Sequence, residues 1–211
     1  MDELVKEFQA MVASTLAPKS VRSKAGANRS ASFRRQVVTA WYAWAQEFYC
    51  DAVGITVGGP SFLKAFSHFF RTRSSDQYYV PRDQQLQRRH PVTWLRTKML
   101  VDRARKHGMQ TSADSVQDAW AETARVLGVH EDYEGTWADD FFLPLRQMLD
   151  DMIEESQPYA HQPSDVTLPG SEEKSPSPVQ LCNLSWDRFE ADRKCYRAWE
   201  KSAIESFLRG A

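Results

Sequence analysis

The chain has 211 residues, 42% of them hydrophobic and 12% aromatic, which is enough apolar material to bury a sizeable core in one main domain with an appendage. Its formal net charge of -1 hides two blocks of opposite sign, because residues 17–110 carry 17 Lys or Arg and 5 Asp or Glu, whereas residues 111–175 carry 3 and 15. No apolar run approaches the roughly eighteen residues that a membrane helix needs, and Asp2 and Glu3 stand where a signal peptide would be basic, so we expect a cytoplasmic protein without a membrane partner.

The chain is expected to begin with a short helix and a flexible arm. Residues 2–16 place four apolar side chains on one face of an amphipathic helix, namely Leu4, Phe8, Val12 and Leu16. Residues 17–32 are polar and basic and show no apolar period, which is typical of a flexible segment. Residues 1–32 are therefore predicted to be an N-terminal helix and a flexible basic arm outside the main domain.

Residues 33–156 are predicted to form the main domain, a bundle of four to five helices. The first helix has a single apolar face, made of Phe33, Val37, Trp41, Trp44 and Phe48. It ends at the VGGP turn of residues 57–60. A second helix follows, with an apolar face of Phe62, Phe66 and Phe69.

Three further helices complete the bundle, and glycines end two of them. The third starts near Pro91 and stops at Gly108, with the apolar face Val92, Leu95 and Met99. The fourth begins after Ser112 and stops at Gly128, with the apolar face Val116, Trp120, Ala124 and Leu127. The fifth starts at Thr136 or Pro144 and ends near Ser156, with the inward side chains Leu145, Met148, Leu149 and Met152. No convincing strand occurs in residues 33–156, so the predicted fold class is all-α.

The last part of the chain is predicted to be a linker and one further helix. Residues 157–180 contain five of the ten prolines together with Ser, Glu and Gly, which is the composition of a disordered or extended linker. Residues 181–211 are predicted to form a C-terminal helix capped by Ser185, with the apolar face Trp186, Phe189, Tyr196, Trp199, Ala203 and Phe207. Such a helix after a linker indicates docking, either onto its own core or onto another subunit.

The basic block is the strongest functional signal in the sequence. It is a candidate nucleic-acid surface formed by Arg71, Arg73, Arg82, Arg88, Arg89, Arg96, Arg103, Arg105 and Lys106. Tyr78, Tyr79 and Trp94 are interleaved with these cations, a mixture expected where phosphates are neutralised and bases stack. The alternative is an ordinary basic face that pairs with the acidic half of the same molecule.

Catalysis has little support in the motifs. The run LDDMIEES places Asp150 and Glu154, and likewise Asp151 and Glu155, one helical turn apart, where they could hold Mg²⁺. The five histidines lack zinc-binding spacing, and no phosphate loop or nucleophile elbow is present. We therefore expect no catalytic residue, no metal ligand and no cofactor, and the carboxylates are more simply a solvated helix face.

The order of these features resembles that of the coat proteins of rod-shaped plant viruses. The resemblance rests on the Trp-rich helix VVTAWYAWAQEFY, the glycine turn, the arginine-rich segment after YYVP, and Phe189-Glu190 followed by Trp199. It implies a four-helix bundle that stacks into a helical rod around RNA, with arginines of residues 71–106 on the phosphates. It also implies carboxylates that face one another across subunit contacts, where their repulsion raises their pKa values and opposes assembly. The subunit-contact candidates are Asp139, Asp140, Asp150, Asp151, Glu154, Glu155, Trp186, Phe189, Glu190 and Trp199.

Three hypotheses about function follow. The first is a non-enzymatic, self-associating protein that binds single-stranded RNA, in its finer form a coat protein located in a virion. The second is a helical adaptor that binds other proteins through its charged halves and its aromatic C-terminal helix. The third is a small Mg²⁺-dependent all-α enzyme that uses Asp150, Asp151 and Glu154.

Overall fold

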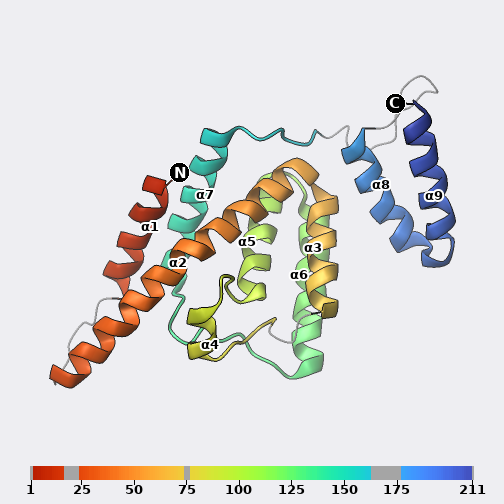
Figure 1. The fold of residues 1–211 in the computed structure, drawn as a ribbon. Coiled ribbons are helices and arrows are strands. Elements are labelled where there is room, and N and C mark those ends of the chain that lie inside the picture. Colours follow the sequence, from red (N-terminus) through yellow and green to blue (C-terminus); the bar gives the residue numbers. More distant parts are fainter. Residues whose placement is uncertain (1, 17–23, 74–76, 163–176, 211) are drawn as a thin grey trace.

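A 35-residue helix, α2 (Lys24–Gly58), crosses the molecule diagonally, and the helices of the core are arranged on its two sides (Figure 1). The computed structural model describes residues 2–16, 24–73, 77–162 and 177–210. Within them the chain is all-α, which confirms the predicted fold class, and the single β-type feature is an isolated bridge between Tyr79 and Asp132.

The five long helices expected in residues 33–156 are all present as α2, α3, α5, α6 and α7. The short helix α4 and the 3₁₀ turn η1 were not predicted. Besides α2, the elements in chain order are α1 (Asp2–Thr15), α3 (Pro60–Arg73), α4 (Arg82–Gln87), α5 (Thr93–Lys106), α6 (Gln110–Leu127), η1 (Asp139–Phe141), α7 (Phe142–Ser156), α8 (Pro178–Ala191) and α9 (Arg193–Gly210).

The predicted flexible arm is wrong over residues 24–32, which form the first turns of α2. This stretch contains three alanines, the best helix former, at positions 25, 27 and 31. Once the packed part of α2 is helical, each further residue adds one hydrogen bond without a new nucleus, so the helix extends beyond its apolar face. The rest of the predicted arm, residues 17–23, lies outside the described residues.

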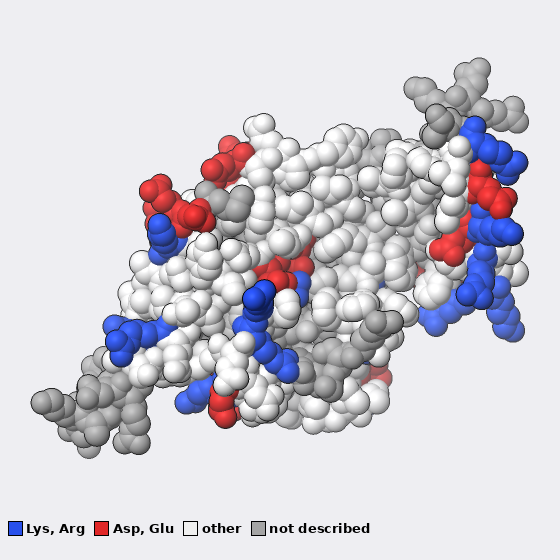
Figure 2. Space-filling view, in the orientation of Figure 1, with Lys and Arg blue, Asp and Glu red and all other residues white. Residues whose placement is uncertain are grey.

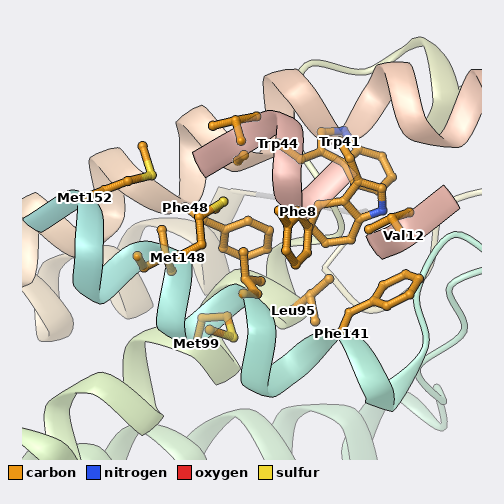
Figure 3. Packing of buried hydrophobic residues seen from close by; sticks show 14 of the residues in the cluster. Phe8, Val12, Trp41, Trp44, Phe48, Leu95, Met99, Phe141, Met148 and Met152 are labelled. Atoms are coloured by element: carbon orange, nitrogen blue, oxygen red, sulfur yellow. The ribbon is translucent and has the colours of Figure 1, made fainter. Parts of the chain in front are cut away.

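The first half of the core joins α1, α2, α5, η1 and α7 around the tryptophans of α2 (Figure 3). Trp41 and Trp44 are fully buried, and Phe8 of α1 and Phe141 of η1 each meet the Trp41 ring edge to face at 5.1 and 5.9 Å between centroids. The buried indole N–H groups have acceptors, because Trp41 donates to the Thr136 carbonyl and Trp44 to the Arg88 carbonyl, at 3.1 and 3.2 Å. The aromatic face predicted for this helix is therefore the centre of the fold.

The second half of the core joins the end of α2 with α3, α5 and α6. Trp120 of α6 is fully buried, stacks on Trp94 at 5.5 Å, and donates its indole N–H to Ser67 Oγ at 3.0 Å. Helix α5 takes part in both halves, since Leu95 belongs to the first cluster and Leu100 to the second. A helix that is buried on two sides leaves few directions in which its charged side chains can reach water.

Two predicted core residues are exposed. Phe69 of α3 is 49% exposed and Leu127 of α6 is 59% exposed. On α3 the core positions are taken by Leu63 and Phe66, because the face that meets α5 and α6 is rotated from the one that the phenylalanine spacing suggested. Leu127 is the last residue of α6.

The turn between α2 and α3 depends on Gly59, whose φ of +60° lies in the left-handed region that favours glycine. The segment after α7 runs back to this turn, where the backbone N–H of His161 donates to the Thr56 carbonyl at 2.9 Å. A Cβ on Gly59 would lie only 2.7 Å from the His161 ring. The described start of the predicted linker therefore packs on the core, while residues 163–176 lie outside the described residues.

The C-terminal segment is a helical hairpin, not the single helix that was predicted. Helix α8 begins three residues before the predicted boundary, where Ser177 and Gln180 form a reciprocal capping box. Asp192 then interrupts the helix, because its carboxylate accepts hydrogen bonds from the N–H groups of Lys194 and Cys195 at 2.9 and 3.2 Å and so starts α9. Ser185 is not a cap, since its hydroxyl donates to the Leu181 carbonyl inside α8.

The hairpin docks on the core through α8. Asn183 is buried, and its Oδ1 accepts a hydrogen bond from the Ser61 N–H at 2.9 Å. Ser61 lies in the first turn of α3, where backbone N–H groups have no partner within the helix. One side chain of α8 therefore caps α3 from outside, and it sets the position of the hairpin at the opposite end of the molecule from α1 (Figure 1).

Candidate nucleic-acid interface

Arg96, at the centre of the predicted RNA surface, is buried among carboxylates. Its guanidinium donates twice to Asp51, from Nε and from Nη2, both at 2.7 Å, and lies 3.3 Å from Glu47. It also lies over the ring of Phe66, 5.2 Å from the centroid. Burial raises the pKa of Asp51 while the bonds from Arg96 act in the opposite direction. The predicted contact of Arg96 with phosphate stays a prediction, and the burial of this side chain, of which only 8% is exposed, does not favour it.

Arg103 is also withdrawn from the surface, with 7% of its side chain exposed. Its Nη1 donates to Asp150 at 2.9 Å, and Lys106 binds the other oxygen of the same carboxylate at 2.5 Å. Although partial burial acts in the opposite direction, these two cations lower the pKa of Asp150. Within the single chain the pKa of Asp150 is therefore lowered and not raised. Its predicted place at a subunit contact stays a prediction, which these ion pairs do not favour.

The remaining cations of α5, and Arg82 of α4, are also paired within the molecule. Arg105 binds Asp114 at 2.7 Å. Lys98 binds Glu131 at 2.5 Å, and Arg82 lies 3.6 Å from Glu134. Asp114, Glu131 and Glu134 all belong to the acidic block, so the pairs join the two charge blocks that the sequence separates. This arrangement is the alternative to an RNA surface along α5, a basic face neutralised by the acidic half of the same chain.

A basic groove remains between α2 and α4. Its volume is about 600 Å³, and three arginines line it, namely Arg35 from α2 and Arg88 and Arg89 from the segment after α4. Among the described residues of the lining Asp83 is the one acidic side chain, and Gln36, Thr39 and Gln87 also belong to it. Figure 2 shows Lys and Arg side chains on the surface over the region where α2 and α4 lie.

The groove is held open by elements that pack on the core. Helix α4 follows Pro81, and its fully buried Gln85 lies among the core residues. At its end the Arg88 carbonyl accepts the Trp44 indole N–H, which fixes the backbone from which Arg88 and Arg89 extend. Arg35 lies eight residues before Ala43 on the same side of α2. We term the surface lined by Arg35, Arg88 and Arg89 the α2–α4 groove.

Of the other two predicted phosphate ligands, one can be placed. Arg71 is exposed on α3 and lines a cavity beside the C-terminal hairpin. Arg73 is the last residue of α3, and its side chain lies outside the described residues. The structure thus divides the other eight predicted cations among buried ion pairs, surface ion pairs, the α2–α4 groove and the α3 surface.

The acidic candidates other than Asp150 lie in η1 and along α7, so they are spread from the start of this helix to its last turn. Asp139 and Asp140 are exposed in η1, and Glu154 and Glu155 are exposed in the last turn of α7. Acidic side chains at a helix C-terminus face the negative end of the helix dipole, which costs about 0.3–1 kcal/mol each. Figure 2 shows acidic groups at the ends of α1 and α7. Asp151 accepts a hydrogen bond from Gln147 at 2.7 Å.

The aromatic candidates lie in the hairpin and are half-buried. Trp186 and Phe189 of α8 meet the His68 ring of α3 edge to face, at 5.8 and 5.7 Å between centroids. Glu190 binds Lys64 of α3 at 2.9 Å. Trp199 of α9 packs on Tyr196 at 5.9 Å. These residues join the hairpin to the core and to itself, and their exposed parts remain open to a further partner.

Sequence reasoning missed two residues that shape these surfaces. Arg35 lies outside the predicted basic block of residues 71–106, and its place beside Arg88 and Arg89 depends on where α4 packs. Asn183 lies three residues before Trp186, on the same side of the helix as the predicted apolar face, and this spacing is the signal that the sequence offers.

The described residues contain no group of three His, Cys, Asp or Glu side chains placed to hold a metal ion. None of their helices is long and apolar enough to span a membrane, and Cys50, Cys182 and Cys195 are free thiols. Comparison of the chain with protein-family models, with curated proteins and with solved structures found no match.

Proposed function

We propose that this chain is a non-enzymatic, self-associating RNA-binding protein whose α2–α4 groove holds the phosphates of single-stranded RNA. The observation that carries the proposal is the composition of the groove, in which the described lining residues include three arginines and one aspartate. An arginine-rich lining of this kind suits the phosphates of a polyanion.

The groove has the chemistry for a strand whose sequence is not read. Guanidinium groups bind phosphate oxygens through two parallel hydrogen bonds. Gln36, Thr39 and Gln87 add amide and hydroxyl groups that form hydrogen bonds with sugars or bases. We therefore expect binding that depends strongly on salt and weakly on RNA sequence.

A triple variant tests the groove. Replacing Arg35, Arg88 and Arg89 by Ala should weaken the binding of an oligouridine strand and reduce the slope of log affinity against log salt by about two to three, one unit for each lost phosphate contact. The measurement is fluorescence anisotropy with a labelled oligouridine at several salt concentrations.

The matched control replaces three exposed arginines outside the groove, Arg125, Arg188 and Arg209, by Ala. It changes the net charge equally and should leave the slope almost unchanged. An equal loss in both triple variants would mean that RNA responds to net charge alone, and the groove would lose its assigned role.

Self-association is supported by the hairpin, whose aromatic side chains Trp186, Phe189, Tyr196 and Trp199 are all only half-buried. The finer form of the proposal, a coat protein that forms rods, rests on the sequence resemblance. Electron microscopy of the purified protein with and without RNA tests it, and rods that form with RNA would support it.

The adaptor hypothesis is favoured by one observation, the pairing of the α5 cations with carboxylates of the same chain. A protein that neutralises its own basic helix has less charge to offer to RNA. Absence of RNA binding at low salt, together with a monomer in sedimentation, would favour the adaptor. The enzyme hypothesis loses its central residue, because Asp150 is occupied by Arg103 and Lys106.

A further inference from the structure

Two adjoining cavities lie where the C-terminal hairpin meets the core. One has a volume of about 320 Å³ and the other of about 130 Å³. They share His68 of α3 and Trp186 and Phe189 of α8 in their linings, so the two cavities adjoin at these three side chains. This site is separate from the α2–α4 groove, with which it shares no lining residue.

The larger cavity is aromatic. Tyr196 and Ser185 complete its lining together with the three shared residues. Phe189 meets Trp186 at 5.5 Å and Tyr196 at 5.4 Å, both at 83° between ring planes. A planar aromatic ligand finds here several rings of the kind on which nucleobases stack.

The smaller cavity is basic. Its described lining includes Lys64, Arg71 and Arg193, together with Ser115 of α6 and one acidic residue, Glu190. Lys64 is already neutralised by Glu190 at 2.9 Å and by Asp187 at 3.2 Å. Although burial acts in the opposite direction, these carboxylates raise the pKa of Lys64.

Arg71 and Arg193 therefore supply the excess charge. Among the described residues no ion pair joins either of them to a carboxylate, and the Arg193 guanidinium lies 4.9 Å from the Phe189 ring centroid. Two guanidinium groups beside a serine hydroxyl are suited to a phosphate group, which accepts bidentate hydrogen bonds from arginine.

We propose that this composite site binds a single nucleotide, with the base in the aromatic cavity and the phosphate between Arg71 and Arg193. The inference goes beyond the RNA groove and stands without it, because it concerns different residues and a different ligand size. The nucleotide is either a free nucleoside monophosphate or one unit of an RNA strand, and both present the same base and phosphate.

Such a ligand would touch both sides of the junction. His68, Arg71 and Ser115 belong to the core, whereas Trp186 and Arg193 belong to the hairpin. A ligand that binds only the docked arrangement stabilises it in proportion to the logarithm of ligand concentration over its Kd. Bound nucleotide should therefore slow amide hydrogen exchange in α8.

The test is calorimetric titration of the full chain with adenosine monophosphate, adenosine and inorganic phosphate. We expect the monophosphate to bind at least tenfold more tightly than either part, since it alone fills both cavities. Arg71→Ala and Arg193→Ala should each reduce monophosphate affinity at least tenfold and leave adenosine affinity unchanged. Arg197→Ala, on the exposed surface of α9, is the matched control and should bind as the parent does. All three arginines are exposed, so these variants should fold.

Competition separates the two sources of the ligand. If the monophosphate displaces a short oligoadenylate from the Arg35, Arg88 and Arg89 triple variant, the site accepts a unit of a strand, and if it binds without displacement, the site is specific for a free nucleotide. No saturable binding of the monophosphate at millimolar concentration, or equal affinity in the Arg71, Arg193 and Arg197 variants, would overturn the proposal. If the triple variant of the α2–α4 groove loses RNA binding but still binds the monophosphate, the result supports the RNA groove and leaves the nucleotide site intact.

Discussion

The buried pair between Arg96 and Asp51 should control the stability of the core, and Asp51→Ala is the change that tests it. In the native protein the Asp51 carboxylate accepts two hydrogen bonds of 2.7 Å from Arg96. The two side chains are 8% and 7% exposed. Removal of the carboxylate leaves the guanidinium buried with most of its compensation lost.

The expected loss of unfolding free energy depends on the contacts that Arg96 keeps in the variant. Breaking a buried pair by removal of one partner costs about 3–5 kcal/mol. Arg96 keeps Glu47 at 3.3 Å and the ring contact with Phe66 at 5.2 Å, so we expect the lower end, about 3 kcal/mol. Since 1 kcal/mol shifts the Tm of a protein of this size by about 2–4 °C, the Tm should fall by roughly 6–12 °C.

Urea denaturation followed by tryptophan fluorescence and by circular dichroism measures this loss. The control is Glu205→Ala, which removes an exposed carboxylate that Lys201 and Arg209 approach at 3.9 and 3.8 Å, and it should change stability by no more than about 0.5 kcal/mol. The double variant Asp51→Leu with Arg96→Met should recover most of the loss, because replacement of a buried pair by apolar side chains is often neutral.

If Asp51→Ala lowers the free energy of unfolding by less than about 1 kcal/mol, the reasoning is refuted, because a solvent-exposed ion pair contributes that little to stability. It would mean that Arg96 reaches water in solution. The guanidinium could then contact phosphate after all, and the RNA surface along α5 would return as a candidate.

The other predictions concern the stability of the protein at low pH and the docking of the C-terminal hairpin. The folded-state pKa of Asp150 is lowered by Lys106 and Arg103, so its contribution to stability is present above the unfolded pKa of about 3.9 and is lost as the pH falls through the lower folded value. The Tm of the parent protein should therefore decrease below about pH 4, more steeply than that of Asp150→Asn, and parallel curves would contradict the ion pair. Asn183→Leu leaves the Ser61 N–H without its acceptor and should cost about 1–3 kcal/mol. It should also speed proteolysis of α8, and unchanged proteolysis would show that Asn183 does not hold the hairpin.

Local features of the sequence were sufficient to predict the five long helices of residues 33–156. The spacing of Trp41, Trp44 and Phe48 identified α2, and Gly108 and Gly128 marked the ends of α5 and α6, because helical periodicity and glycine stops depend only on neighbouring residues. The same reasoning failed at residues 24–32 and at Asp192. In the first case propagation from a packed helix extended it, and in the second a single side chain capped a new one.

The candidate surfaces could be predicted only in part. Composition pointed to Arg88 and Arg89, which line the α2–α4 groove, but it pointed equally to Arg96 and Arg103, which are buried. A count of charges cannot distinguish them, because it contains no information about which carboxylate lies opposite each cation.

What the sequence determined by itself is therefore the all-α class, the main helices and the two blocks of charge. Tertiary structure decided how the charges are used. Arg96 and Asp51 are 45 residues apart in the chain, and Arg103 and Asp150 are 47 apart. Helical periodicity arises from the local geometry of the backbone and is visible in a short window. Ion pairing depends on which helix faces meet, and that is settled only when α5 packs between the two halves of the core and its charged side chains reach the nearest carboxylates.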